Sequence, residues 1–166
     1  MLKKWFVVVV LLVCSVGAVA EECTGAKGTY LTTKVDTSGV DKGSVGRTIL
    51  SLSPGGFATM TDSAQYGFKG YQAFGMMQGS WSCLSESDEN TTITVTLLDF
   101  SYPSAEDPDA KVALVEITGA INGKTGELQG TTKVKLYPIS DDPFSDATPE
   151  VDVGYTFSGQ RIPNTH

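Results

Sequence analysis

The chain has 166 residues, a net charge of −7 and only two arginines, Arg47 and Arg161. A chain of this length fits one domain that buries a core of its own. Because nucleic acids and anionic lipid surfaces attract clustered positive charge, this acidic balance excludes both as expected partners.

The first segment, Met1–Ala20, has the pattern of a cleaved secretory signal. Two lysines precede an apolar run over Trp5–Val16, which is shorter than the roughly 20 residues that span a bilayer. The small residues of Ala18-Val19-Ala20 suit a signal peptidase. We therefore expect cleavage near Ala20 and a single mature domain over residues 21–166, secreted or periplasmic, that does not span a membrane.

Two cysteines, Cys23 and Cys83, remain once Cys14 leaves with the signal. An even pair in an exported protein is typical of a disulfide. Such a bond would close a loop of about 60 residues and stabilise the fold by roughly 3–4 kcal/mol in the chain-entropy model. Two free thiols or a metal site are the alternatives, and the cysteines make a poor zinc set because no histidine lies near them.

The mature segment is rich in Gly, Thr and Ser, and its apolar residues alternate without a helical period, which is typical of an all-β domain. Turn signals separate the alternating runs: Pro54-Gly55-Gly56, the glycine- and aromatic-rich stretch Gln65–Gly75, Asn122-Gly123 and two acidic loops that contain proline. Gly130, inside one run, marks a candidate bulge or bend. The sequence predicts eight strands, over Gly28–Val35, Gly46–Ser53, Phe57–Ala64, Met76–Leu84, Thr91–Tyr102, Lys111–Ile121, Glu127–Tyr137 and Val151–Ile162.

Consecutive strands with short connections pair antiparallel. Eight of them can close into an up-and-down β-barrel with room inside for side chains or one small ligand. A two-layer sandwich is the alternative. We prefer the barrel because the connections follow a meander and no long crossover is needed.

Several short motifs resemble those of small exported bacterial barrels of the lipocalin-like (calycin) or allene-oxide-cyclase-like type. They are Gly28-Thr29-Tyr30, Asp62-Ser63-Ala64-Gln65, Gln78-Gly79-Ser80-Trp81 and Phe157–Ile162. Lipocalins carry Gly-x-Trp in the first strand, packed against a late arginine. Here Tyr30 takes the place of that tryptophan and Arg161 matches the arginine, whereas Trp81 lies in mid-chain, which favours the cyclase-like barrel or an uncharacterised relative. An arginine in this place can stack on the tyrosine ring and donate to nearby carbonyls, a contact worth roughly 0.5–2 kcal/mol.

Acid–base groups are restricted to carboxylates, because the one histidine is the terminal His166 and no Ser-His-Asp or Cys-His arrangement is available. Asp99 shares a strand face with Ile93, Val95 and Leu97 and is a weak catalytic candidate, since a buried carboxylate would have a raised pKa. Glu116, which alternates with Val112 and Leu114, is a second weak candidate. No metal and no cofactor are expected.

Ligand-binding candidates fall on one loop and on the central strands. Tyr66, Phe68 and Tyr71 are interleaved with glycines and could form a lid over an apolar ligand, or could cap the core with no ligand at all. The predicted wall of the site consists of Trp81, Leu98, Phe100 and Tyr102. The leading hypothesis is non-enzymatic binding of a small apolar or amphipathic molecule; the alternatives are a cyclase or isomerase and a protein-interaction module such as an inhibitor or envelope factor.

Overall fold

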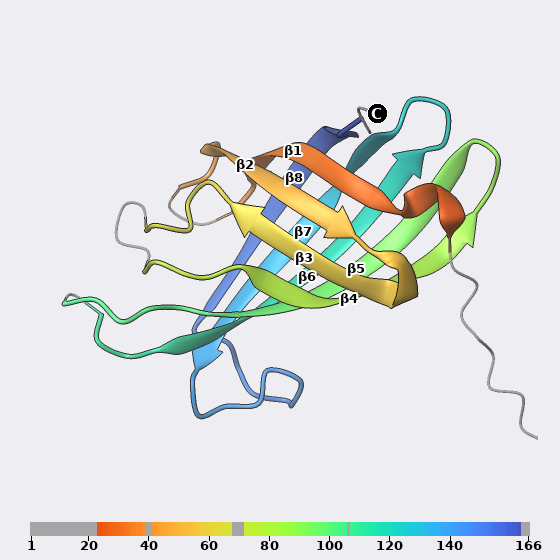
Figure 1. The fold of residues 1–166 in the computed structure, drawn as a ribbon. Coiled ribbons are helices and arrows are strands. Elements are labelled where there is room, and N and C mark those ends of the chain that lie inside the picture. Colours follow the sequence, from red (N-terminus) through yellow and green to blue (C-terminus); the bar gives the residue numbers. More distant parts are fainter. Residues whose placement is uncertain (1–22, 39–40, 68–71, 106, 164–166) are drawn as a thin grey trace, which may run out of the picture.

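Eight antiparallel strands form a closed barrel in the computed structural model of this chain, which describes residues 23–38, 41–67, 72–105 and 107–163. Each strand pairs with its neighbour in the sequence, as the meander in Figure 1 shows. The predicted all-β, up-and-down barrel is confirmed, and the alternative of two stacked layers is wrong. The strands are β1 (Gly28–Asp36), β2 (Val45–Leu52), β3 (Phe57–Asp62), β4 (Met77–Glu86), β5 (Asn90–Phe100), β6 (Lys111–Asn122), β7 (Glu127–Pro138) and β8 (Val151–Arg161).

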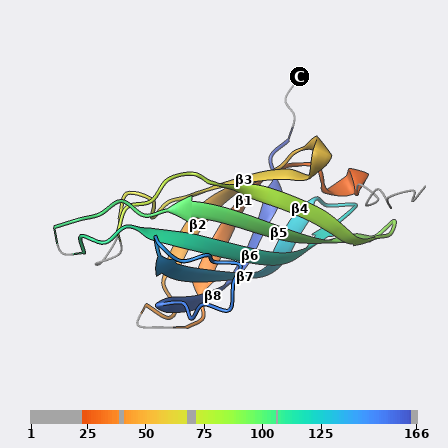
Figure 2. The same cartoon turned by 90° about the horizontal axis from the view of Figure 1, so that it is seen from below.

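The last strand, β8, hydrogen-bonds back to β1 and closes the barrel. The pairing is antiparallel and runs from Tyr30 opposite Arg161 to Asp36 opposite Tyr155. Figure 2 shows the strands wrapped around a common interior. Because closure pairs the first strand with the last, neither strand presents an edge of unpaired backbone groups to other chains.

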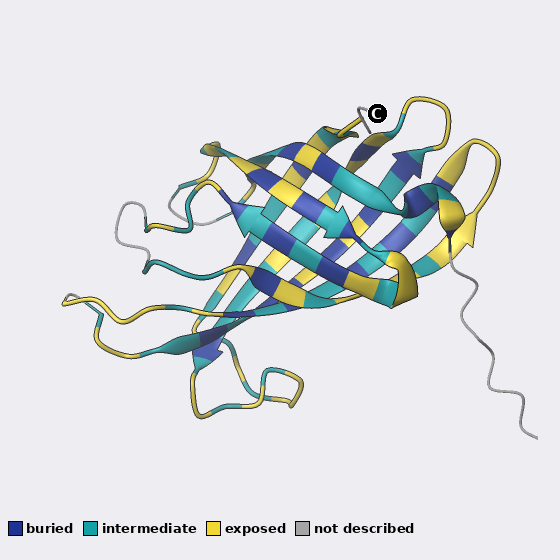
Figure 3. Cartoon of the chain, viewed as in Figure 1, coloured by how far each residue is buried: buried dark blue, intermediate teal, exposed yellow. Residues whose placement is uncertain are grey.

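Alternation along the strands separates an inner from an outer face, and Figure 3 shows it as buried and exposed residues that follow one another. On β5, Ile93, Val95 and Leu97 are buried while the threonines between them are not. The main core includes inward-facing apolar residues from all eight strands. Its largest fully buried side chains are Tyr30, Leu50, Ile93, Leu97, Ile121 and Leu128.

Gly130 is not the site of a bulge, although the sequence made it a candidate. It pairs in regular register with Gly119 on β6 and with Phe157 on β8. A Cβ on Gly130 would lie only 2.1 Å from the carbonyl oxygen of Thr118 and 3.0 Å from Cζ of Phe157. The glycine is therefore needed for a close approach of strands and ring. The register shifts instead on β4, between Cys83 and Ser85.

One end of the barrel, here called the closed end, is covered by the short 3-10 helix η1 (Thr24–Ala26) that precedes β1. The predicted disulfide between Cys23 and Cys83 is present and ties this helix to β4, with the two Cα atoms 5.5 Å apart. The N–H of Gly25 also donates to Oε1 of Glu86 on β4, at 2.8 Å. A second 3-10 turn, η2 (Pro54–Gly56), joins β2 to β3 at this end.

The predicted secretory signal, Met1–Ala20, lies outside the described residues. Within the described part of the chain, none of the helices has the length and apolar character needed to cross a bilayer.

Candidate functional site

The barrel end opposite η1, here called the polar end, carries three inward-facing carboxylates. Asp36 and Asp62 are the last residues of β1 and β3, and Asp99 is the last but one of β5. All three are buried. Because β1, β3 and β5 all run towards this end, an aspartate near the end of each places three carboxylates around the same opening.

Two of these carboxylates shape the turns that follow them. Oδ1 of Asp36 accepts a hydrogen bond of 2.8 Å from the N–H of Ser38, and Oδ1 of Asp62 accepts one of 2.9 Å from the N–H of Ala64. An aspartate that accepts the amide two residues on is a common way to start a turn. Asp36 and Asp62 therefore have a structural role at the strand ends, and the second oxygen of Asp62 is left for another partner.

That partner is Lys34, on β1, which forms an ion pair and hydrogen bond with Oδ2 of Asp62. The ammonium also lies over the ring of Tyr155 on β8, 4.6 Å from its centroid. Such a cation–π contact is favourable by about 0.5–2 kcal/mol, depending on desolvation. The side chain of Asp62 is 4% exposed and that of Lys34 is 19% exposed, so the pair lies inside the barrel rather than on its surface.

Gly46, the residue opposite Lys34 on β2, leaves the space that the lysine stem occupies. A Cβ at Gly46 would lie 2.8 Å from Cε of Lys34, which is too close for a real contact. A side chain at position 46 would therefore require the flexible lysine stem to shift. Lys34 and Gly46 lie opposite each other on the neighbouring strands β1 and β2, and Asp62 on β3 completes the ion pair.

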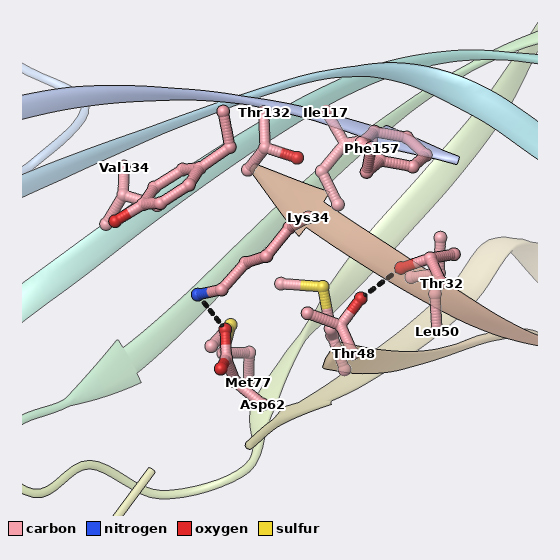
Figure 4. Close-up of a pocket in the computed structure, with 12 residues that line it drawn as sticks. Thr32, Lys34, Thr48, Leu50, Asp62, Met77, Ile117, Thr132, Val134 and Phe157 are labelled. Carbon is pink, nitrogen blue, oxygen red and sulfur yellow. Dashed lines mark hydrogen bonds and ion pairs between the residues drawn. The ribbon is translucent and has the colours of Figure 1, made fainter. Parts of the chain in front are cut away.

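A cavity of about 30 Å³ lies beside this ion pair, and Figure 4 shows the side chains around it. Its polar part includes Lys34, Asp62 and the hydroxyls of Thr32 and Thr48, which hydrogen-bond to each other. A volume of this size holds about one water molecule. The remaining lining residues are Leu50, Met60, Met77, Ile117, Thr132, Val134, Tyr155 and Phe157.

Two methionines make the apolar floor of this cavity adaptable. Met60 and Met77 pair across β3 and β4, and both are buried. Methionine is unbranched and flexible, so it rearranges around a bound molecule more readily than a branched side chain does. The site can therefore accept a molecule larger than the empty volume of the cavity suggests.

Asp99 faces inward, as its alternation with Ile93, Val95 and Leu97 predicted. Burial raises the pKa of its carboxyl, while hydrogen bonds from the N–H groups of Phe100 and Gly75 oppose this effect. Its Oδ2 atom is buried and has no hydrogen-bond partner among the described residues. Asp99 is thus the carboxylate whose environment best fits acid–base chemistry, although it does not line the cavity.

Glu116, the other predicted acid, lies on the outer face of β6. Its side chain is 47% exposed and accepts a hydrogen bond of 2.8 Å from Nζ of Lys135 on β7. This bond raises the pKa of Lys135. Glu116 and Asp99 therefore lie on opposite faces of the sheet and do not form a catalytic pair.

The structure separates the residues predicted as a ligand wall. Trp81 is buried and donates from Nε1 to the carbonyl of Ser53 at 2.8 Å, which places it near the closed end. Leu98 packs on the outside of the barrel, in a small apolar cluster with Val112, Leu114 and Tyr137. Phe100 and Tyr102 are exposed, as is Tyr66 from the predicted lid, whereas Phe68 and Tyr71 lie outside the described residues.

Sequence reasoning did not single out Lys34 and Asp62. The sequence did contain a signal for them. Lys34 lies on the same strand face as Tyr30 and Thr32, and Asp62 lies on the same face as Ala58 and Met60, each at a spacing of two residues. A charged residue that continues an inward-facing series at a strand end is expected at the rim of the interior. Their opposite charges make them natural partners once β1, β2 and β3 are neighbours.

In the described part of the chain, no three His, Cys, Asp or Glu side chains converge in a way that could hold a metal ion. Comparison of the sequence with protein-family models and with curated proteins, and of the structure with solved structures, finds no match.

Proposed function

We propose that this protein is an exported, non-enzymatic barrel that binds a small amphipathic molecule at its polar end. The observation that supports this most directly is the Lys34–Asp62 ion pair, which borders a cavity with an apolar floor. Binding sites for small molecules are usually apolar hollows with a few polar groups that orient the ligand. At the closed end, where η1 and the disulfide lie, Cys23, Ala26 and Tyr30 are fully buried in the main core.

The driving force would be burial of apolar ligand surface against the methionine floor, worth about 25 cal/mol per Å² before entropic losses. Because the cavity holds only about one water in its present form, Met60 and Met77 must move aside for a larger molecule. The ion pair would then orient the polar head of the ligand.

Native mass spectrometry of the protein purified from its own host tests this proposal, since a retained ligand appears as a mass increment. Titration with N-phenyl-naphthylamine, a neutral dye that brightens in apolar sites, provides a second measurement. Thr132→Phe fills the cavity and is expected to abolish dye binding, whereas Thr131→Phe, the neighbouring residue on the exposed outer face, is expected to keep it. Absence of both a mass increment and dye binding would contradict the proposal.

A protein-interaction module is the second candidate function, because two cross-strand apolar pairs are exposed on the outer face of β1 and β2. Leu31 lies opposite Ile49, and Val35 lies opposite Val45. The pair Thr33–Arg47 lies between them, and exposed apolar side chains bordered by polar ones are a feature of interaction surfaces. Photo-cross-linking from position Ile49 in the intact host, with Ser158 on β8 as control, should yield a discrete adduct only at Ile49 if this function holds.

The cyclase or isomerase alternative stays a prediction. The feature that favours it is the inward, buried carboxyl of Asp99 near the same end of the barrel.

A further inference from the structure

We infer that the cavity at the polar end selects an uncharged polar head group, and that the Lys34–Asp62 pair is the device that rejects carboxylates. This inference rests on the proposed function and names the chemical class of its ligand: an apolar tail with a hydroxyl or amide head. It follows from the arrangement of charges at the ion pair.

The first step is that the charge of Lys34 is already neutralised. Its ammonium pairs with Oδ2 of Asp62, and its remaining surroundings include the face of the Tyr155 ring. A carboxylate brought to this place would be attracted by Lys34 and repelled by Asp62 at similar distances. The two effects largely cancel, so the cost of removing the carboxylate from water is left uncompensated.

The second step is that a neutral head can use both partners. A hydroxyl can donate to the carboxylate of Asp62 and accept from the ammonium of Lys34, and it carries no net charge to desolvate. The hydroxyls of Thr32 and Thr48 lie in the same lining and offer further hydrogen bonds. An ammonium head meets the same difficulty as a carboxylate, with the roles of Lys34 and Asp62 exchanged.

The test uses octanol, octanoate and octylammonium, which share one tail and differ in the charge of the head. Calorimetric titration of the wild-type protein at neutral pH should show octanol binding at least about tenfold more tightly than either ion, the ratio expected for one charge-assisted hydrogen bond. Equal or tighter binding of octanoate by the wild-type protein would overturn the inference.

Two single variants should reverse the selectivity in opposite directions. Asp62→Asn frees Lys34 and is expected to make octanoate the tightest ligand of the three. Lys34→Met frees Asp62 and is expected to favour octylammonium. Because each variant supplies an independent result, the inference stays testable if circular dichroism shows that one of them does not fold.

Asp99→Asn is the matched control, since it removes a buried carboxylate near the same rim but outside the cavity lining. This variant should bind the three ligands in the same order of affinity as the wild-type protein does. An octanoate preference in this variant would show that the overall charge of the rim, not the ion pair, sets the selectivity. Failure of the proposed function would look different, because none of the three ligands would then bind to the wild-type protein or to any variant.

Discussion

Arg161 and Tyr30 join the last strand of the barrel to the first. The guanidinium of Arg161 lies 5.3 Å from the centroid of the Tyr30 ring, and its Nη2 donates to the phenolic oxygen at 2.7 Å. The same nitrogen donates to the carbonyl of Gly25, and the Tyr30 hydroxyl donates to the carbonyl of Ala26 at 2.7 Å. The contact predicted from the lipocalin-like pattern is present and holds η1 on the closed end.

Replacing Arg161 with Ala should therefore loosen the closed end as well as destabilise the fold. The change leaves a buried tyrosine hydroxyl and a carbonyl without their donor, so we expect the free energy of unfolding to fall by about 2–3 kcal/mol. Urea unfolding measures this loss. Arg161→Lys keeps the charge but not the planar fork of donors, and should recover only part of it. A full recovery by lysine would show that charge alone is what matters.

Gly130→Ala should destabilise the barrel by about 2 kcal/mol or more, because the new Cβ would lie 2.1 Å from the backbone oxygen of Thr118 and force two strands apart. Thermal unfolding followed by circular dichroism measures the effect. Thr131→Ala, at the next residue on the exposed face, is the control and should change stability by less than about 0.5 kcal/mol. Similar losses in the two variants would contradict the packing argument.

Removal of the Cys23–Cys83 bond by the double variant Cys23→Ser and Cys83→Ser should lower the free energy of unfolding by roughly 3–4 kcal/mol, since the bond closes a loop of 60 residues. The rate of amide hydrogen exchange should increase most around η1, because the bond ties this helix to β4. Uniform exchange across the barrel, with η1 no more affected than β6, would show that the bond acts only on the unfolded chain.

Asp99 should make stability depend on pH in the acidic range. Because burial raises its pKa in the folded protein above the ordinary value of 3.8, the folded state keeps this proton to a higher pH than the unfolded chain does. The contribution of Asp99 to the free energy of unfolding therefore falls as pH rises from 3.8 through the raised pKa, and is constant above it. The opposite slope would mean that hydrogen bonds to the ionised form outweigh burial.

Asp99→Asn has no such proton and should lack this fall in stability. Urea unfolding of both proteins at a series of pH values gives a difference curve in which the other carboxylates cancel. We expect the variant to gain relative to the wild type as pH rises through the acidic range, and the difference to be flat near neutral pH.

The polar end shows where sequence reasoning stops. On β5, Ile93, Val95 and Leu97 fall on one face and the threonines between them on the other, so the inward position of Asp99 could be predicted from alternation alone. On β6, Val115 and Ile117 are buried inside the barrel, while Val112 and Leu114 are buried outside it in the cluster with Tyr137. Since both faces of this strand are apolar, alternation groups Glu116 with Val112 and Leu114 but does not say which side they take.

The sequence by itself indicated the eight strands and their antiparallel order, because alternation and turn residues are local properties. The even pair of cysteines favoured the disulfide, and the Tyr30–Arg161 contact was expected from the resemblance to lipocalins rather than from any local pattern. Only the tertiary structure decided which face of β6 points inward and how much of the interior is filled. It also decided that Lys34 meets Asp62 across 28 residues of sequence, which requires the register of three strands, with Gly46 opposite Lys34 on the strand between them. These features depend on how the sheet curls and closes, and closure is a property of all eight strands together.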